Sequence, residues 1–254
     1  MIRLKSQFDI EKLAEAGKIL AGVLNELEGM VKVGTAGMEL ERKARRLIAD
    51  AGCRPAFLNY APGGHDPFPA ALCVSVNSAV VHGIPTEKEF ADRDVVGLDL
   101  GLVFEDKYFV DSARTAIAGG GSSEERRLVE VTYEALMRGI EQAQPGGKLG
   151  DIGEAIQQYV ESRGFGVVRE LVGHGVGYGV HEEPQVPNFG KAGTGLRMEP
   201  GLVIAIEPMV TAGDAAIKTG PDGWAVVAAD GGLTAHAEHT VAVTDTGPII
   251  LTRA

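Results

Sequence analysis

Five side chains that can bind a metal stand in segments whose other residues are mostly apolar. They are Asp99, Asp111, His174, Glu207 and Glu238. Three of the acids lie in, or directly before, apolar segments that predict buried strands, namely 95–104, 201–210 and 239–244. An ionised carboxylate in an apolar strand is so unfavourable that it is normally neutralised, paired with a cation or bound to a metal. The repeated occurrence of such acids predicts a cationic partner for them.

Two of these acids are predicted to lie on one β-hairpin. The segments 95–104 and 108–118 resemble paired strands, and the charged residues 105–107 form the turn between them. With the turn centred on its first residue, Asp99 and Asp111 face each other at the cross-strand distance of ~4.5–5.5 Å. Carboxylates this close repel unless they share a proton or a cation. Taken alone, however, the pair is explained equally well as ordinary surface acids of a hairpin.

The segment 171–188, LVGHGVGYGVHEEPQVPN, carries two histidines among glycines. It has neither a GxGxxG pattern nor a Lys-Ser/Thr pair, so it does not indicate a phosphate-binding loop. It is not a zinc-protease helix either, because Gln185 stands where the second histidine is needed and Pro184 would break the helix. Taken singly, His174 and His181 are more simply explained as hydrogen-bonded structural residues.

The candidate ligands are more informative as a set than singly. A lone Glu207 or Glu238 at the end of a strand is equally a residue that faces water. Four carboxylates and one histidine, by contrast, can hold two divalent ions, with some of the carboxylates bridging. Two such ions ~3.5–4 Å apart generate a hydroxide nucleophile and polarise a carbonyl or phosphoryl oxygen. The combination predicts metal-assisted hydrolysis.

Composition and charge exclude several other functions. The chain has 254 residues, of which 44% are hydrophobic, as is typical of a soluble globular protein. Its 24 basic and 35 acidic residues give a net charge of −11, which argues against a nucleic-acid-binding surface. We find neither a membrane-length apolar segment nor a secretory signal. The two cysteines, Cys53 and Cys73, have no CxxC spacing and suit a reducing cytosol.

Two pairs of helices are predicted to position these residues. The first pair begins near Ser6, which has capping-box spacing to Asp9, and its second helix covers about 38–51. The second pair begins after Ser122, is broken by a Pro-Gly pair and ends at Gly164. Each pair is followed by segments that resemble strands and that carry two of the acids.

The two helix pairs align at a constant offset of 112 residues. Gly34 falls on Gly146, and apolar helix positions after these glycines also coincide. Several coincidences in register indicate a duplicated α+β unit. The alternative is that amphipathic helices resemble one another by composition alone. The repeat predicts one catalytic domain over 1–254, with related halves of about 1–118 and 119–254.

The candidate residues and their neighbours resemble the bacterial type I methionine aminopeptidases. The matching stretches are VVHGIP around His82, the Asp99–Asp111 hairpin, GHGVGYGVHEEPQVPN, IEPMV around Glu207 and AEHTVAV around Glu238. The similarity extends over essentially the whole chain. It implies the pita-bread fold of that family, an α+β architecture of two pseudo-symmetric halves with helices outside a curved antiparallel sheet.

The resemblance also implies an activity and its cofactors. Such an enzyme is a metalloaminopeptidase that removes the N-terminal methionine of nascent proteins when the second residue is small. It uses two divalent cations, with Co, Mn, Fe and Zn as candidates, to activate a water that attacks the methionine carbonyl. By position, Asp111 and Glu238 bridge the two ions, Asp99 completes one site, and His174 and Glu207 complete the other. Glu207 also assists proton movement.

Further residues receive roles from the same resemblance. His181 stabilises the charge that develops on the carbonyl, and His82 contacts the substrate near the scissile amide and helps the leaving amine. Cys73, Phe68 and Trp224 match positions near the pocket for the methionine side chain. An apolar, polarizable lining there suits a thioether.

The chain departs from the family pattern at three places. Val180 stands in the pocket where the bacterial enzymes commonly carry an aromatic residue. The loop 59–69 is longer than usual, and the hairpin between Asp99 and Asp111 is one residue longer at its tip. None of these differences touches a predicted metal ligand, so they bear on the shape of the pocket.

Three other hypotheses use the same fold. An Xaa-Pro aminopeptidase or prolidase usually carries an extra N-terminal domain, whereas this sequence begins directly with the catalytic unit. A non-catalytic binding protein would have lost metal ligands, and all five are present. A type II methionine aminopeptidase would carry a helical insertion in its second half.

The favoured hypothesis implies a cytoplasmic monomer that acts on nascent N-termini with transient ribosome contact, and no nucleic-acid or membrane partner.

Overall fold

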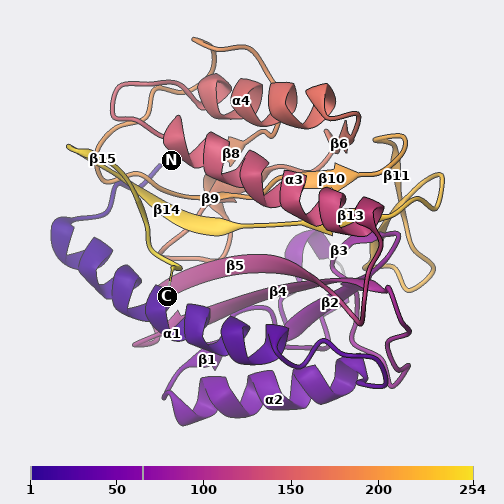
Figure 1. Cartoon of the computed structure of the whole chain (residues 1–254). Helices are drawn as coiled ribbons and strands as arrows, with labels where there is room; N and C mark the ends of the chain where they lie inside the picture. The colour runs from indigo at the N-terminus through magenta and orange to yellow at the C-terminus, as the bar shows by residue number, and fades with distance from the viewer. Residues whose placement is uncertain (1, 65, 254) are drawn as a thin grey trace.

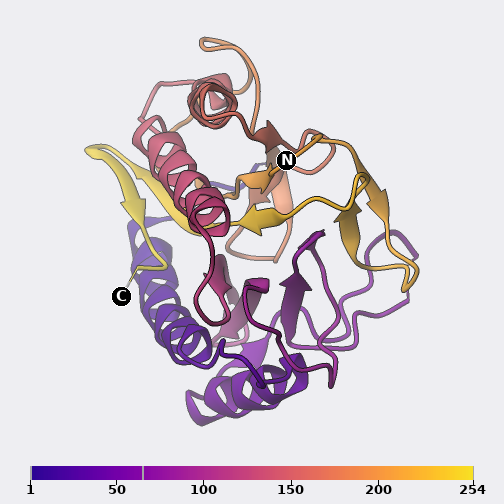
Figure 2. The ribbon, with the colours of Figure 1, turned by 45° about the vertical axis from the view of Figure 1, so that its right-hand side comes forward.

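The computed structural model describes residues 2–64 and 66–253. Within these residues four α-helices lie on the outside of the molecule and the strands lie between them (Figure 1). The helices are α1 (Gln7–Glu28), α2 (Gly37–Asp50), α3 (Ser123–Glu141) and α4 (Leu149–Ser162). Helices α1 and α2 cover one side and α3 and α4 the opposite side, as a second view confirms (Figure 2). In the described chain, no helix combines the length and apolar character that crossing a membrane requires.

Helices α1 and α3 begin where their capping residues predict. The Ser6 side chain accepts the N–H of Asp9, and the Asp9 carboxylate accepts the N–H of Ser6, both at 3.2 Å. Ser122 and Glu125 form the corresponding box at the start of α3. These bonds satisfy N–H groups that the first turn of a helix leaves unpaired. Both predicted helix starts are confirmed.

The backbone repeats at the offset seen in the sequence. The bounds of α4 are those of α2 shifted by 112 residues, and the same shift relates β1 (Arg54–Pro55) to β6 (Gly166–Val167). Gly34 and Gly146 both have a φ of 85°, which side chains rarely allow. The repeated elements support the duplicated unit, while the boundaries of the two halves stay a prediction.

The described strands form four sheets in which every pair is antiparallel. The first sheet contains β1, β4 (Val95–Phe104), β2 (Leu72–Val76) and β5 (Tyr108–Ile117). The second contains β15 (Gly247–Ile250), β14 (His239–Thr244), β9 (Val203–Ile206), β7 (Gly173–Gly175) and β8 (Glu182–Val186). A third contains β13 (Thr234–His236), β10 (Met209–Thr211) and β6, and a fourth contains β11 (Ile217–Thr219), β12 (Val226–Ala228) and β3 (Ala79–Val81). The pairing of β3 with β12 joins the two halves.

The β4–β5 hairpin forms as predicted, but the register of its two acids differs from the prediction. The turn centres one residue later than expected, because Phe104 pairs with Tyr108. Asp99 therefore lies opposite Ala113 and not opposite Asp111. The two acids are diagonal neighbours on the same face of the sheet, a relation that corresponds to about 7–8 Å. The prediction that they face each other directly was wrong.

The two acids of the second half lie directly opposite each other, unlike those of the first half. Ile206 pairs with His239 at the end of the β9–β14 pairing, which places Glu207 opposite Glu238. The register continues unchanged in the β10–β13 pairing beyond this point. The two halves therefore present their acids with different spacing, so that the site between them is asymmetric.

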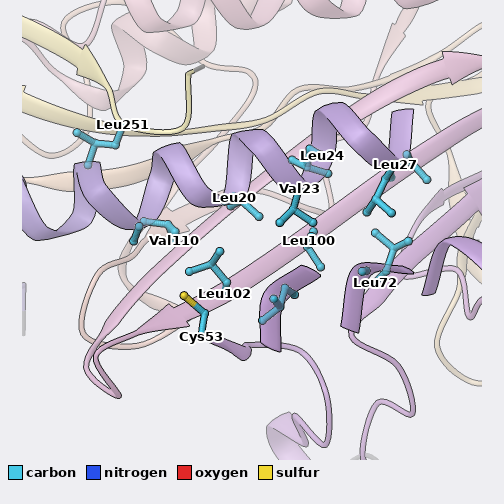
Figure 3. Close-up of a cluster of buried hydrophobic side chains, with 14 of the residues drawn as sticks. Leu20, Val23, Leu24, Leu27, Cys53, Leu72, Leu100, Leu102, Val110 and Leu251 are labelled. Carbon is cyan, nitrogen blue, oxygen red and sulfur yellow. The ribbon is translucent and has the colours of Figure 1, made fainter. Parts of the chain in front are cut away.

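Each helix pair packs its apolar face against the strands of its own half. In the first half, Leu20, Leu24 and Leu27 of α1 meet Leu100 and Leu102 of β4 in one buried cluster (Figure 3). A second cluster joins α3 and α4 to β9, β10 and β14. Full burial of a leucine side chain stabilises a fold by roughly 1.5–3 kcal/mol. These two cores hold the acid-bearing strands in place.

Candidate metal centre and its cavity

A cavity of about 600 Å³ collects most of the predicted site residues. Its lining includes all five candidate metal ligands and, beside them, His82, His181, Phe68, Cys73 and Trp224. Both halves of the chain contribute to this lining. Residues that are up to about 170 positions apart in the sequence therefore share one concave site, which is the usual setting of an active site.

Three of the five candidate ligands form a close cluster. One donor atom each of Asp111, His174 and Glu238 lies within 4.8 Å of the other two. Strand β5 carries Asp111, β7 carries His174, and Glu238 directly precedes β14. The Thr240 hydroxyl lies 3.1 Å from Asp111 Oδ1 and also accepts the main-chain N–H of Asp111 at 3.1 Å. Only small adjustments would bring the three donor atoms onto one ion.

The orientation of the His174 ring favours a cation beside it. Its Nδ1 lies 2.9 Å from the carbonyl oxygen of Gly175, so in the neutral ring Nδ1 carries the proton and donates it. The lone pair of Nε2 then faces Asp111 Oδ2 at 3.3 Å and Glu207 Oε1 at 3.5 Å. Three acceptors that meet in this way repel one another unless a proton or a metal ion lies among them. An imidazole held by a carbonyl at Nδ1 is also the usual arrangement of a metal-binding histidine.

Glu207 contacts two histidines, of which His174 belongs to this cluster and His236 does not. Its Oε1 lies 3.5 Å from His174 Nε2, and its Oε2 lies 3.4 Å from His236 Nε2. His236 Nε2 is buried and has no hydrogen-bond partner in the described part of the chain. Asn188 Nδ2 donates to the main-chain oxygen of Glu207 at 3.0 Å. A buried nitrogen that has a carboxylate nearby but no hydrogen bond fits a site that a bound ion completes.

Burial raises the pKa values of the four acids. The pKa of Asp99 rises to about 7 and that of Glu207 to about 8, and the pKa values of Asp111 and Glu238 rise as well. Neighbouring carboxylates add to the rise for Asp99, Glu207 and Glu238, because each negative charge disfavours the next. A divalent ion would take the place of the protons that such acids otherwise retain. Carboxylate oxygens with one imidazole nitrogen suit Mn, Fe, Co or Zn.

An apolar wall stands beside the acids. The rings of Phe68 and Trp224 meet edge to face, with centroids 5.1 Å apart. Phe68 and Cys73 belong to one buried cluster, against which Phe57 and Trp224 pack. Burial raises the pKa of the Cys73 thiol well above its ordinary value, so that Cys73 is a neutral, apolar thiol. This wall can receive an unbranched apolar side chain.

His82 reaches the cavity from the loop after β3, whereas Val180 does not reach it. His82 has a φ of 59°, and burial lowers its pKa to about 4, so its ring is neutral. Gly83 lets this loop pass close to β2, because a Cβ there would lie 2.2 Å from the carbonyl oxygen of Val74. Val180 is buried, and it is not among the cavity-lining residues of the described chain. Its predicted contact with the substrate is not supported by this position.

His181 stands beside the cluster and contacts an aromatic residue. Its Nδ1 lies 2.7 Å from the Tyr60 hydroxyl, and the two rings are 5.1 Å apart. On another side its ring meets that of His174, with centroids 4.4 Å apart. Although His181 is open to the cavity, the surrounding protein keeps bulk water from much of its ring and lowers its pKa.

Two residues of the site were missed in the sequence. His236 stands two positions before Glu238, and alternate residues of a strand share a face. That spacing was a usable signal for His236. Tyr60 lies in the long loop 59–69, where no periodic pattern indicated the direction of its side chain. Only the folded loop brings it to His181.

Comparisons with known proteins identify the family of this chain. The model of metallopeptidase family M24 matches residues 11–245. A methionine aminopeptidase of Clostridium perfringens is 46% identical over 252 residues, which cover 99% of both chains. Methionine aminopeptidase 1 of Bacillus subtilis is 44% identical over 253 residues, with full coverage of both. The chain belongs to the methionine aminopeptidases of metallopeptidase family M24.

Solved structures confirm the pita-bread fold of the methionine aminopeptidases. The methionine aminopeptidase of Thermotoga maritima superposes with a TM-score of 0.95 at 42% identity, with full coverage of both chains. The prolidase of Pyrococcus furiosus reaches a TM-score of 0.79 at 24% identity, and the match covers 65% of that chain. The likeness to prolidase concerns the fold alone. The sequence relatives support the methionine aminopeptidase hypothesis and not the Xaa-Pro alternative.

The raised carboxyl pKa values of this methionine aminopeptidase predict how its stability depends on pH without metal. An acid whose pKa is higher in the folded than in the unfolded chain stabilises the fold while it is protonated, and this contribution is lost as the pH rises through the folded pKa. For Asp99 and Glu207 this loss begins near their unfolded pKa of ~4 and is complete at their folded values of about 7 and about 8. The lowered pKa values of His82 and His181 change the stability only below their unfolded pKa of ~6.5.

We therefore expect the melting temperature of chelator-treated protein to fall between about pH 6.5 and 8. Saturating Mn²⁺ should remove this fall, because bound carboxylates stay ionised throughout the range. Thermal unfolding followed by circular dichroism at several pH values, with and without the ion, checks both expectations. A metal-free melting temperature that rises across this window would contradict the raised pKa values.

Proposed function

We propose that this chain removes the N-terminal methionine from nascent proteins whose second residue is small. The observation that carries the proposal is the position of five side chains that can bind a metal ion beside an apolar wall in one cavity. The donors supply a place for Lewis-acid chemistry, and the wall supplies a place for an apolar side chain. A free N-terminus that enters this cavity would lay its first side chain on the wall and its first carbonyl at the donors.

The resemblance assigns each donor a place in a two-ion site. Asp111 and Glu238 would bridge the two ions, Asp99 would complete one site, and His174 and Glu207 would complete the other. The His174 Nε2 lone pair, 3.3 Å from Asp111 and 3.5 Å from Glu207, supports its part in this assignment. When bound, divalent ions polarise a carbonyl oxygen and lower the pKa of a water molecule. Co, Mn, Fe and Zn are the candidate ions.

Three side chains of the cavity would act on the substrate. Glu207 would accept the proton that the attacking water releases, and would pass it towards the leaving amine. His181 would donate a hydrogen bond to the oxygen of the scissile carbonyl as negative charge develops there. His82, a neutral ring at the cavity edge, would contact the scissile amide and help the amine to leave.

The pocket for the methionine side chain would be the wall of Phe68, Cys73 and Trp224. A thioether packs well against aromatic rings, with its sulfur ~5 Å from a ring. The Cys73 thiol, neutral and buried, would keep that end of the pocket apolar. Such a wall explains a preference for methionine over charged first residues, because a charge there would lose its hydration without a partner.

We further propose the cellular setting that this activity implies. The enzyme would work in the cytoplasm as a monomer whose two halves, about 1–118 and 119–254, form one catalytic domain. Its partners would be nascent N-termini, met in transient contact with the ribosome. With a net charge of −11, the chain is not suited to direct nucleic-acid binding.

Peptide hydrolysis tests the proposed function. We expect metal-loaded enzyme to cleave Met-Ala-Ser and to cleave Met-Lys-Ser at least ~100-fold more slowly, a ratio within reach of steric discrimination. The expectation follows from the family resemblance, which implies cleavage only before a small second residue. Product methionine is measured by chromatography after chelator-treated enzyme is reloaded with Co, Mn, Fe or Zn.

An Xaa-Pro peptide and the metal-free enzyme are the controls. Chelator-treated enzyme should be inactive on every peptide, because no residue of the site supplies the Lewis acid. Faster release of the first residue from Ala-Pro-Ser than from Met-Ala-Ser would support the Xaa-Pro aminopeptidase hypothesis instead. Absence of hydrolysis with every metal would support a non-catalytic binding protein.

A further inference from the structure

The long loop 59–69 places a hydroxyl on the proposed oxyanion-binding histidine. Tyr60 Oη lies 2.7 Å from His181 Nδ1, a normal length for a hydrogen bond. The two rings also pack against each other at 5.1 Å with an interplanar angle of 46°. This contact joins residues 121 positions apart and engages Nδ1 of the ring, so that Nε2 is the nitrogen that would meet a substrate carbonyl.

The hydrogen bond couples the tautomer of His181 to the direction of the Tyr60 hydroxyl, because a hydroxyl can donate to Nδ1 or accept from it. A neutral imidazole has one N–H donor and one acceptor, so a donor that occupies Nδ1 leaves the proton on Nε2. Tyr60 can be that donor, because burial raises its pKa and the hydroxyl keeps its proton. The tautomer with Nε2–H is the one that can donate to a carbonyl oxygen.

The main chain of the loop holds Tyr60 in this position. Tyr60 N–H donates to the carbonyl of Phe57, and the Tyr60 carbonyl accepts the N–H of Phe68, both at 2.9 Å. Asn59, with a φ of 64°, donates in turn to the Phe68 carbonyl at 2.9 Å. The same turn therefore places Phe68 in the apolar wall and Tyr60 on the histidine. His65 lies outside the described residues.

The backbone next to His181 is anchored separately. Glu182 forms an ion pair with Lys5 Nζ at 2.8 Å, and their side chains are only 8% and 2% exposed. The Glu182 carboxylate also accepts the N–H of Tyr178 at 2.6 Å. A buried, hydrogen-bonded ion pair of this kind holds the chain but leaves rotation of the His181 ring free. Tyr60 is the described hydrogen-bond partner that restricts this rotation.

We propose that Tyr60 is a positioning residue for His181, which orients the ring and sets the Nε2–H tautomer through its hydroxyl. This inference rests on the proposed function of His181, and it goes beyond it by naming the group that prepares the histidine. Tyr60 does not touch the reacting atoms in this role. The loop 59–69 then serves both substrate selection, through Phe68, and the chemical step, through Tyr60.

The test compares Tyr60→Phe with Tyr159→Phe. The first variant keeps the aromatic packing and removes only the hydroxyl. The second is a matched control, because Tyr159 lies on α4 and its ring contacts the guanidinium groups of Arg138 and Arg163, away from the site. For Tyr60→Phe we expect kcat on Met-Ala-Ser to fall about 10-fold, the lower end of the range for partners that orient a functional histidine. KM should stay within twofold, and metal content should not change.

A spectroscopic measurement determines the tautomer of His181 in metal-free protein, without any turnover of substrate. In ¹⁵N-labelled, chelator-treated protein, with His181→Ala used to assign the signals, Nδ1 of His181 should have the shift of an unprotonated ring nitrogen and Nε2 that of an N–H. Tyr60→Phe should mix the two tautomers, whereas Tyr159→Phe should leave them unchanged. If the wild-type enzyme hydrolyses no methionyl peptide, the proposed function fails, and this arm alone decides the link between Tyr60 and His181.

Three results would overturn the proposal. Unchanged kcat together with an unchanged tautomer in Tyr60→Phe would show that the hydroxyl does not prepare His181. A raised KM with normal kcat would make Tyr60 a pocket-lining residue only. Loss of bound metal or of thermal stability in Tyr60→Phe, beyond that of Tyr159→Phe, would assign it a structural role.

Discussion

Replacing Glu238 by alanine is expected to abolish metal loading and peptide hydrolysis together. Glu238 lies within 4.8 Å of donor atoms of Asp111 and His174 and would bridge both ions. Its removal would therefore take one ligand from each ion at once. We expect kcat/KM on Met-Ala-Ser to fall at least ~10³-fold, because no other group of the site supplies the Lewis acid. Asp111→Ala should have the same effect for the same reason.

Metal content and activity have to be measured on the same samples. Bound Mn per chain, determined by atomic spectroscopy after dialysis, should fall to background in Glu238→Ala. Glu130→Ala is the matched control, because Glu130 is an exposed acid on α3, and it should bind metal and hydrolyse peptide like the wild type. Activity retained in a fully metal-loaded Glu238→Ala protein would refute the bridging assignment.

Replacing His181 by alanine is expected to separate turnover from metal binding. His181 meets His174 at a ring distance of 4.4 Å, but the proposed role of its ring is to donate to the substrate carbonyl and not to hold an ion. Removal of one donor to a developing oxyanion lowers kcat by about 10²–10³-fold in a hydrolase with an oxyanion hole. We therefore expect a loss of that order in kcat for Met-Ala-Ser, with metal content equal to that of the wild type.

The split between kcat and KM decides between the roles of His181. Because the hydrogen bond strengthens as charge develops, its loss should appear mainly in kcat and not in KM. Isothermal titration of the chelator-treated variant with Mn²⁺ measures metal affinity directly. Loss of metal binding in His181→Ala would make it a ligand, and a change confined to KM would make it a binding residue.

Local features of the chain were predictable because neighbouring residues decide them. Ser6 with Asp9 starts α1, and Ser122 with Glu125 starts α3, since both caps form from residues three positions apart. The β4–β5 hairpin also formed, because its turn and its apolar alternation are local. Its register was predicted one residue early, since the closing Phe104–Tyr108 pair is not visible in the turn sequence.

Long-range pairing was not predictable in the same way. The segment 71–85 forms β2 and β3 as expected, but β2 pairs with β4, while β3 crosses to β12 in the other half. Strand propensity identifies a strand without its partner, because the partner is selected by packing of the whole domain. Val180 illustrates the same limit, because it stands beside His181 in the chain but is not among the cavity-lining residues of the described chain.

The amino-acid sequence by itself determined the family, the repeat and the set of five candidate ligands. Acids in apolar strands are unusual enough to be recognised one by one, and their flanking stretches are specific. Only the tertiary structure decided the diagonal relation of Asp99 and Asp111, the contact of His236 with Glu207, and the hydroxyl of Tyr60 on His181. The physical reason is that distances of 3 Å between distant segments depend on strand register and loop closure, which the packed cores of both halves set together.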